Sequence, residues 1–211
     1  MGLLTRREQR KEAAAPPPQH PAETYKSLAL KALLEQLLGD WRYSILDLGS
    51  AVGANVAFLS QFASTIRVED LYRTLNAARF FDHGEEPVEE SAFERLVSIP
   101  RETRFDIILG WDLINYFRTD ELAPLIRYIG RFCRPGSFLF AISSTLKEIP
   151  ATPTNFKIQD AETLIYETGA TRMRPCPRYV PRDLGRLMSG FHVRNSYLLR
   201  NGMQEYLFMR D

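Results

Sequence analysis

The feature that most constrains the fold of this chain is a short apolar run followed by a loop of small residues. Residues 43–48 form the apolar run, residues 49–53 form the loop, and apolar side chains then recur at helical spacing over residues 55–62. This order predicts a buried strand, a tight turn and a helix. Strands that run into helices in this way are the building units of α/β proteins, so we predict an α/β fold.

The strand and helix pattern repeats along the chain. Further strands are predicted at residues 65–69, 105–110 and 137–143, and each of the first two is followed by a helical pattern. Strands that alternate with helices predict a three-layer, doubly wound and mostly parallel sheet with helices on both faces. One more strand should lie within residues 81–104, but this stretch shows no clear pattern and its position stays open.

The two ends of the chain differ from this pattern. Residues 1–22 combine mixed charge, an alanine run and four prolines, and are predicted to be a disordered tail. Apolar residues at helical spacing then predict a helix over residues 23–39. Near the other end, residues 191–199 and 203–209 are β-rich runs joined across Asn201-Gly202, which predicts a C-terminal antiparallel hairpin.

Composition narrows the classes of function. The 211 residues carry a formal net charge of +1, which makes a nucleic-acid partner unlikely on bulk charge. No apolar run approaches the roughly 18 residues that span a bilayer, and the start of the chain lacks the apolar core of a secretory signal. Cys133 and Cys176 fit neither a disulfide framework nor a metal site. We expect a soluble, cytoplasmic protein with no metal and no membrane partner, whose oligomeric state the sequence leaves open.

The small-residue loop is also the first candidate ligand site, because ligands of open parallel sheets bind beyond the carboxyl ends of the strands. Gly49 permits the sharp turn out of the strand, Ser50 and Ala51 let a ligand approach the backbone, and Gly53 allows close packing at the helix start. Asp70 follows the next strand, where a carboxylate can accept both hydroxyls of a ribose. The alternatives are an ordinary tight turn for the loop and a helix N-cap for Asp70.

Several segments carry a resemblance to a known family. They are residues 45–53 with Asp70 at its spacing from them, residues 105–112, and the turn at residues 134–136. On these segments and the closing hairpin, the chain resembles the class I S-adenosylmethionine-dependent methyltransferases over about residues 23–211. The resemblance implies a Rossmann-like methyltransferase domain with S-adenosyl-L-methionine as cofactor. A nicotinamide oxidoreductase is disfavoured by the terminal hairpin and by the absence of the G-x-G-x-x-G spacing.

The resemblance also implies which residues contact the cofactor. Asp47 and the loop backbone would hold the methionine amino group, Asp70 would hold the ribose, and Trp111 or Asp112 would line the methionine end. The residues predicted to bind the cofactor are Asp47, Gly49, Ser50, Ala51, Gly53, Asn55, Asp70 and Trp111. Ala51 stands where the family has the middle glycine of its loop, and its methyl group narrows the space beside the methionine part.

Methyl transfer from a sulfonium is an in-line displacement that depends mainly on proximity and alignment. Asp112, Asn115 and Tyr116 follow the fourth strand, where the resemblance places the transferred methyl, so we predict that they contact the substrate and act in catalysis. Asp112 could instead cap the following short helix, and Tyr116 could be a core residue. The Asn/Asp-Pro-Pro-Phe/Tyr signature of methyltransferases that act on planar amines is absent, which disfavours adenine and glutamine amides as acceptors.

A long insertion, residues 147–186, precedes the closing hairpin. Within it, residues 156–158 and 164–166 resemble a small hairpin that we expect to act as a lid or substrate region. The insertion also contains Arg172, Arg174, Arg178, Arg182 and Arg186, opposed only by Asp183. Arginine clusters recognise carboxylate and phosphate, so an anionic substrate or an acidic partner protein would suit them; the alternative is a solvated basic face.

The sequence therefore predicts an S-adenosylmethionine-dependent methyltransferase that acts on an unidentified small molecule or protein. The alternative is a catalytically inactive protein of the same fold that serves as a binding or regulatory partner. Ala51 and the unassigned third strand are the features that support this alternative. The fold does not separate the two, because activity belongs to the site.

Overall fold

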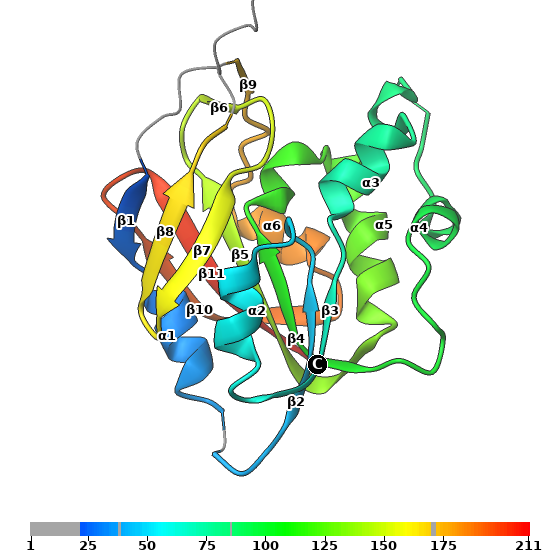
Figure 1. The fold of residues 1–211 in the computed structure, drawn as a ribbon. Helices are drawn as coiled ribbons and strands as arrows, with labels where there is room; N and C mark the ends of the chain where they lie inside the picture. The colour runs from blue at the N-terminus through cyan, green and yellow to red at the C-terminus, as the bar shows by residue number, and fades with distance from the viewer. Residues whose placement is uncertain (1–21, 38, 85, 170–171) are drawn as a thin grey trace, which may run out of the picture.

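The computed structural model describes residues 22–37, 39–84, 86–169 and 172–211, so the predicted tail lies outside the described residues except for Ala22. A six-stranded sheet forms the centre of the domain (Figure 1). Its strands are β2 (Tyr43–Asp47), β3 (Ala63–Val68), β4 (Phe105–Trp111), β5 (Cys133–Ser144), β10 (Phe191–Leu198) and β11 (Met203–Arg210). Their order across the sheet is β10-β11-β5-β4-β2-β3.

The strand directions confirm the predicted mostly parallel, doubly wound sheet. β2 pairs in parallel with β3 and with β4, and β4 pairs in parallel with β5. Of the six strands, β11 is reversed, because it runs antiparallel to both β5 and β10. The predicted C-terminal hairpin is therefore confirmed, and Gly202 in its turn has a φ of +80°, a conformation that favours glycine.

Helices cover both faces of the sheet, because successive strand residues point to opposite sides. Leu46 and Ile108 pack on one side, and their neighbours Ile45 and Ile107 pack on the other. The side with Ile45 is covered by α1 (Leu28–Leu34) and α2 (Gly53–Leu59), and the opposite side by α3 (Leu71–Ala77), α4 (Glu90–Leu96), α5 (Thr119–Gly130) and α6 (Pro181–Leu187). In the described part of the chain, no helix has the length and apolar character needed to cross a bilayer.

The start of the domain differs from the single helix expected over residues 23–39. A short strand, β1 (Glu23–Lys26), comes first, and α1 begins after it at Leu28. The side chain of Ser27 caps this helix by accepting a hydrogen bond of 3.2 Å from the backbone N–H of Leu30. β1 forms because it pairs with a strand of the distant insertion, a contact that local periodicity does not reveal.

The insertion supplies four strands and α6. They are β6 (Glu148–Pro150), β7 (Asn155–Asp160), β8 (Thr163–Glu167) and β9 (Met173–Pro175). β7 and β8 form the hairpin predicted within the insertion, and β1 extends it to a small antiparallel sheet of order β1-β8-β7. This sheet lies beside α2 (Figure 1), so the first described strand and the insertion together form one wall next to the carboxyl end of β2.

The strand expected within residues 81–104 is not formed among the described residues of that stretch, and β3 is the edge of the six-stranded sheet. α4 and the segment after it take its place. Val97 and Ile99 are buried in the core, and the carbonyl of Ser98 accepts a hydrogen bond of 2.8 Å from the guanidinium of Arg67 on β3. A side-chain bond thus anchors this segment where a ladder of backbone bonds was expected.

Candidate functional site

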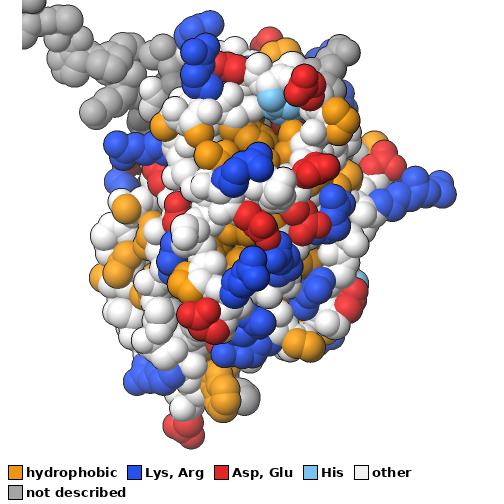
Figure 2. All heavy atoms as spheres, turned by 90° about the vertical axis from the view of Figure 1, so that its right-hand side faces the viewer, with side chains coloured by type: hydrophobic (Ala, Val, Ile, Leu, Met, Phe, Trp, Pro, Cys, Tyr) orange, Lys and Arg blue, Asp and Glu red, His pale blue; other side chains and the backbone are white. Residues whose placement is uncertain are grey.

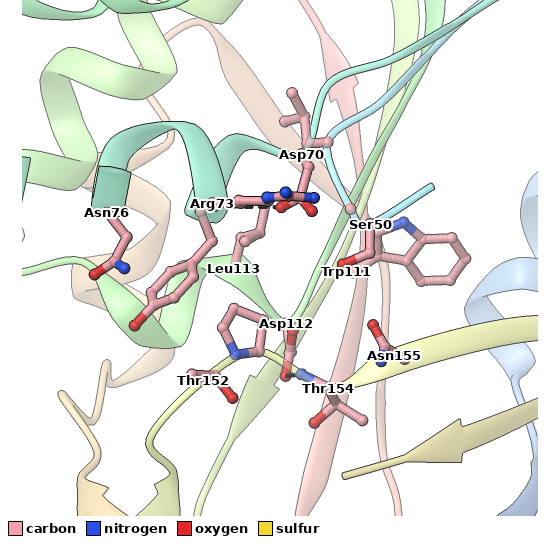
Figure 3. A pocket seen from close by; sticks show the side chains of 14 residues that line it. Ser50, Asp70, Arg73, Asn76, Trp111, Asp112, Leu113, Thr152, Thr154 and Asn155 are labelled. Atoms are coloured by element: carbon pink, nitrogen blue, oxygen red, sulfur yellow. Dashed lines mark hydrogen bonds between the residues drawn. The ribbon is translucent and has the colours of Figure 1, made fainter. Parts of the chain in front are cut away.

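Two cavities meet at the carboxyl ends of β2 and β4. The larger one, which we call the loop cavity, has a volume of about 290 Å³, and Figure 3 shows it from close by. Its walls include Gly49, Ser50, Asp70, Arg73, Trp111 and Asp112. The smaller one, which we call the apolar cavity, has a volume of about 150 Å³ and shares Asp112 and Thr154 with the first.

Asp47 ends β2 below the loop cavity and is almost fully buried. Its Oδ1 accepts a hydrogen bond of 2.7 Å from the indole N–H of Trp111 and one of 3.0 Å from the backbone N–H of Gly49. Burial raises the pKa of Asp47 to about 6, and these two hydrogen bonds oppose the rise. Both of these bonds use Oδ1 of Asp47.

Trp111 is the last residue of β4. Its side chain lies between the insertion and the loop of residues 49–53, which we call the glycine loop. Its backbone has a φ of 48°, which is uncommon for a residue other than glycine. Its indole stacks on the ring of Phe156 in β7, with centroids 5.6 Å apart and planes 6° apart. On the other side, a Cβ built on Gly49 would lie 2.5 Å from Cδ1 of Trp111, so a glycine is required at this position.

Asp70 follows β3, as predicted, and it also has the alternative role of a helix N-cap. It caps α3, because its Oδ1 accepts a hydrogen bond of 3.2 Å from the backbone N–H of Arg73. Its side chain also lines the loop cavity, on the side away from Asp112 (Figure 3). An N-cap uses one carboxylate oxygen, and the other is available to a ligand.

The remaining loop residues take different positions. Ser50 and Ala51 line a further open hollow that also includes Asp70. Gly53 begins α2, and a Cβ built on it would meet nothing within 4 Å. Asn55, which we expected at the cofactor, has another role: its amide donates to the carbonyl of Phe156 at 2.9 Å, and its oxygen accepts the N–H of Ile158 at 2.8 Å. Asn55 therefore anchors β7 to α2.

Asp112 lies between the two cavities, directly after β4. Its Oδ2 accepts a hydrogen bond of 3.0 Å from the backbone N–H of Thr154 (Figure 3). Its Oδ1 is buried and has no hydrogen-bond partner in the described part of the chain. Burial raises the pKa of Asp112 from 3.8 to about 7, although the bonds from Thr154 oppose the rise. A carboxylate with this pKa can accept a proton near neutral pH.

Asn115 and Tyr116 line the apolar cavity, but the fold already uses their polar atoms. The amide of Asn115 donates to the carbonyls of Asp112 and Ile142, and its oxygen accepts the N–H of Ser144 at 2.8 Å. The hydroxyl of Tyr116 lies 2.8 Å from the carbonyl oxygen of Thr152, in the loop before β7. Of the three predicted substrate contacts, Asp112 is thus the one with a free hydrogen-bonding atom.

Some residues of the site were missed by the sequence prediction. Thr154 holds Asp112, and Phe156 stacks on Trp111; both come from the start of the predicted small hairpin. The available signal was the insertion itself, which is longer than a simple connection and so a candidate for function. Which of its side chains reach the end of β4 depends on the long-range packing of β7 on α2.

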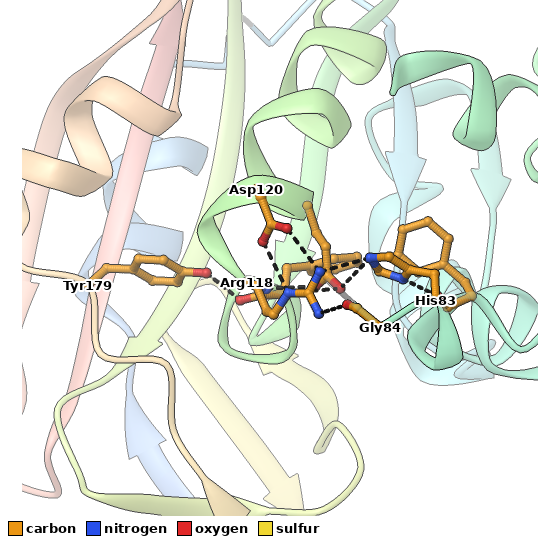
Figure 4. Close-up of polar contacts among 8 residues, drawn as sticks. His83, Gly84, Arg118, Asp120 and Tyr179 are labelled. Carbon is orange, nitrogen blue, oxygen red and sulfur yellow. Dashed lines mark hydrogen bonds and ion pairs between the residues drawn. The ribbon is translucent and has the colours of Figure 1, made fainter. Parts of the chain in front are cut away.

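A hydrogen-bonded cluster fixes the segment between β4 and α5 (Figure 4). Arg118 donates to Nε2 of His83 at 2.9 Å, and its backbone N–H donates to the buried carboxylate of Glu121 at 2.7 Å. The hydroxyl of Tyr179, near the end of the insertion, donates to the carbonyl of Phe117. The segment that begins at Asp112 is therefore held from the loop after α3 and from the insertion.

The five arginines of the insertion do not form part of either cavity. Arg172, Arg174, Arg178, Arg182 and Arg186 line neither of them. Arg174 lies with its guanidinium 5.7 Å from the ring centroid of Tyr116, and Arg186 faces Asp183 at 3.9 Å. Figure 2 shows acidic and basic side chains interspersed on the face of α3, α4 and α5, with no large area of one sign.

Comparisons with known proteins identify the fold. No family model and no curated protein matches the sequence. Among solved structures, the PH0226 protein of Pyrococcus horikoshii is 16% identical, with 87% of this chain and 88% of that chain covered and a TM-score of 0.52. An S-adenosylmethionine-dependent methyltransferase of Mesorhizobium loti is 15% identical, with 85% and 96% covered and a TM-score of 0.52. The chain therefore has the fold of the class I S-adenosylmethionine-dependent methyltransferases.

Proposed function

We propose that this chain is an active S-adenosylmethionine-dependent methyltransferase. The observation that carries the proposal is the position of Asp112, which lines both the polar loop cavity and the apolar cavity beside it and has one buried oxygen without a hydrogen-bond partner in the described part of the chain. Methyl transfer needs two adjacent sites, one for the donor and one for the acceptor. The likeness of the fold to a methyltransferase of Mesorhizobium loti supports the same assignment.

The residues of the loop cavity suit the cofactor. The carboxylate of Asp70, which lines the cavity, would accept the ribose hydroxyls, and Oδ2 of Asp47, which takes part in neither bond to Oδ1, would accept the methionine amino group. The glycine loop offers backbone rather than bulky side chains between them. When bound, S-adenosylmethionine supplies a methyl group activated by its positively charged sulfur. The indole of Trp111, fixed against Gly49 and Phe156, would form an apolar wall beside the methionine end.

The protein's own contribution would be to align the two substrates, to exclude water from the site and to accept a proton at Asp112. The β7–β8 hairpin, anchored by Asn55 and stacked on Trp111 through Phe156, would close the site on one side as a lid. Asp112 would accept the proton that a hydroxyl or amine acceptor releases, since its pKa of about 7 makes it a base near neutral pH. Asn115 and Tyr116 would act as positioning residues for Asp112 and for the loop that carries Thr154.

A binding or regulatory protein without turnover is the second candidate function. The observation in its favour is the hydrogen bond from Trp111 to Asp47, which already satisfies one of the two carboxylate oxygens of the residue assigned to the methionine amino group. On this account the loop cavity would bind the cofactor weakly or not at all. The two candidates therefore differ in a measurable affinity.

Calorimetric titration of the full-length protein with S-adenosylmethionine tests the proposal. Asp70→Ser is the informative variant, because serine is also a good N-cap and so preserves α3 while it removes the carboxylate. We expect the native protein to bind and Asp70→Ser to bind at least about tenfold more weakly, which corresponds to about 1.4 kcal/mol. Asp82→Ser, which removes an exposed carboxylate paired with Arg79, is the matched control and should bind like the native protein.

Two results would contradict parts of this account. Absence of binding by the native protein would exclude the methyltransferase assignment and favour the second candidate function. Binding that Asp70→Ser leaves unchanged would show that the ribose lies elsewhere.

A further inference from the structure

The walls of the apolar cavity indicate what kind of molecule it can hold. Its aliphatic and aromatic walls come from β5, β6, β7, β9, β11 and the connections between them, and include Ile142, Leu146, Ile149, Phe156, Met173 and Met203. Its volume is about 150 Å³. An apolar cavity of about this size accommodates a benzene-sized molecule. The body of a ligand that fits is therefore a single ring or an aliphatic group of similar size.

The charged side chains that line this cavity are acidic. Asp112 and Glu148 are the two charged residues among its described lining residues, and no lysine, arginine or histidine lines it. An acceptor that carries a carboxylate or phosphate would lie beside Asp112 with no cation among the described lining residues to balance it, because Arg174 lies over the ring of Tyr116 and does not line the cavity; this is unfavourable where water is excluded. This argues against the anionic substrate that the five arginines of the insertion suggested.

One buried polar atom of a residue that lines the cavity lacks a hydrogen-bond partner. Oδ1 of Asp112 is a buried acceptor without a partner in the described part of the chain, a state that is unfavourable. The neighbouring Asn115 and Tyr116 use their polar atoms within the fold, so they do not satisfy it. A ligand that brings an O–H or N–H group to this position removes the penalty.

We infer that the methyl acceptor is a small, apolar, neutral or positively charged molecule that binds in the apolar cavity and donates the hydrogen of a hydroxyl or amine group to Oδ1 of Asp112. This inference rests on the proposed function. In the transfer, a lone pair on the acceptor oxygen or nitrogen forms the bond to the methyl carbon, and the pair of the broken carbon–sulfur bond stays on sulfur. The proton of the acceptor passes to Oδ1 of Asp112, so charge and atoms balance.

Binding of simple probes tests the inference without turnover. The probes p-cresol, p-toluidine, p-toluate and p-xylene share a methylated ring and differ in carrying a hydroxyl, an amine, a carboxylate or no polar group. Titrations at about pH 8, above the pKa of Asp112 of about 7, present the ionised carboxylate. We expect the native protein to bind p-cresol and p-toluidine at least about tenfold more tightly than p-toluate or p-xylene, a difference of about 1.4 kcal/mol.

Two variants test whether Asp112 causes the preference for p-cresol over p-toluate. In Asp112→Asn, the ratio between p-cresol and p-toluate should fall by about tenfold, because the amide removes the negative charge that excludes the anion. Asp183→Asn makes the same change at an exposed carboxylate outside both cavities and should leave the ratio as in the native protein. Thermal melting of each variant identifies any that fails to fold.

The outcomes separate this inference from the proposed function. If p-toluate binds as tightly as p-cresol, if Asp112→Asn keeps the native ratio, or if no probe binds, the inferred acceptor class is wrong. Such results leave the proposed function standing whenever S-adenosylmethionine binds with the dependence on Asp70 described above. If the cofactor does not bind but the probe ratios are as expected, the cavity is a ligand site and the methyltransferase assignment is wrong.

Discussion

The indole nitrogen of Trp111 lies 2.7 Å from Oδ1 of Asp47, and this hydrogen bond joins the carboxyl ends of the neighbouring strands β2 and β4. Because the same indole stacks on Phe156, it also connects the sheet to the β7–β8 hairpin. The contact thus links the glycine loop, the fourth strand and the insertion at one point. Perturbing it should change the stability of the whole domain.

Trp111→Phe removes this donor while it keeps an aromatic ring. A hydrogen bond to a buried charged group contributes about 1.5–3 kcal/mol, so we expect the free energy of unfolding at neutral pH to fall by about that amount. The pKa of Asp47 should rise further, because the bond from Trp111 opposes its elevation. Urea unfolding measures the first effect. Trp41→Phe is the control: Trp41 is 60% exposed, and its loss should change stability by less than about 0.5 kcal/mol.

The two glycines of the loop should respond oppositely to alanine. In Gly49→Ala, the new Cβ would lie 2.5 Å from the indole of Trp111, and such overpacking destabilises by about 1–3 kcal/mol. In Gly53→Ala, the new Cβ meets nothing within 4 Å, and alanine in a helix is about 0.5–1 kcal/mol more stable than glycine. Chemical denaturation of both variants tests this difference, and equal effects would contradict the close contact of Gly49 with Trp111.

Asp112 should make the protein less stable as pH rises. The pKa of Asp112 is about 7 in the folded protein and its ordinary value is 3.8. The stabilisation that comes from this raised pKa is therefore fully present below about pH 4, where the carboxyl group is protonated in both the folded and the unfolded protein. The contribution declines as pH rises, until the folded state also releases the proton at about pH 7. The loss amounts to on the order of 4 kcal/mol.

Asp112→Asn removes this titration. Its stability relative to the native protein should therefore increase between about pH 4 and pH 8, by up to the same 4 kcal/mol. Asp47, with a pKa raised to about 6, contributes a smaller decline that persists in the variant. Unfolding curves at several pH values measure the difference, and a pH-independent difference between the two proteins would contradict the burial assigned to Asp112.

The central layer was predictable because local patterns determine it. The apolar run before Gly49 and the Asn-Gly turn near the end specify strands whose pairing follows from the right-handed α/β unit and the hairpin. Gly49, Asp70, Trp111 and Asp112 could be placed at one cavity for the same reason, since each lies at or just after the carboxyl end of a strand of the sheet; their roles toward a ligand stay predictions.

The errors arose where distant segments decide the structure. Residues 23–26 have the spacing of a helix but form β1, because β8 offers them a pairing edge. Asn55 was expected at the cofactor, yet the backbone of β7 takes both ends of its amide. The strand expected within residues 81–104 is absent from the described residues for a similar reason, since side-chain bonds from Arg67 on β3 and Tyr128 on α5 hold the segment after α4.

Asn55 should control the position of the hairpin. Asn55→Ala leaves the carbonyl of Phe156 and the N–H of Ile158 without their partners, and each buried unsatisfied group costs about 1–3 kcal/mol. We expect lower stability and, by hydrogen exchange, faster exchange of the β7 and β8 amides than of those in β4. Asn195→Ala, which removes a side chain bonded to Tyr197 on the edge strand β10, is the control and should leave β7 unchanged. Uniform exchange across the domain would contradict a local role for Asn55.

The central claim is that the loop cavity binds S-adenosylmethionine with its methyl group directed at Asp112. A crystal structure of the native protein with S-adenosylhomocysteine, the product that lacks the methyl group, tests it most directly. We expect the product in the loop cavity, with its ribose hydroxyls at the carboxylate of Asp70 and its sulfur facing Oδ1 of Asp112. A product bound outside this cavity, or with its ribose away from Asp70, would contradict the claim.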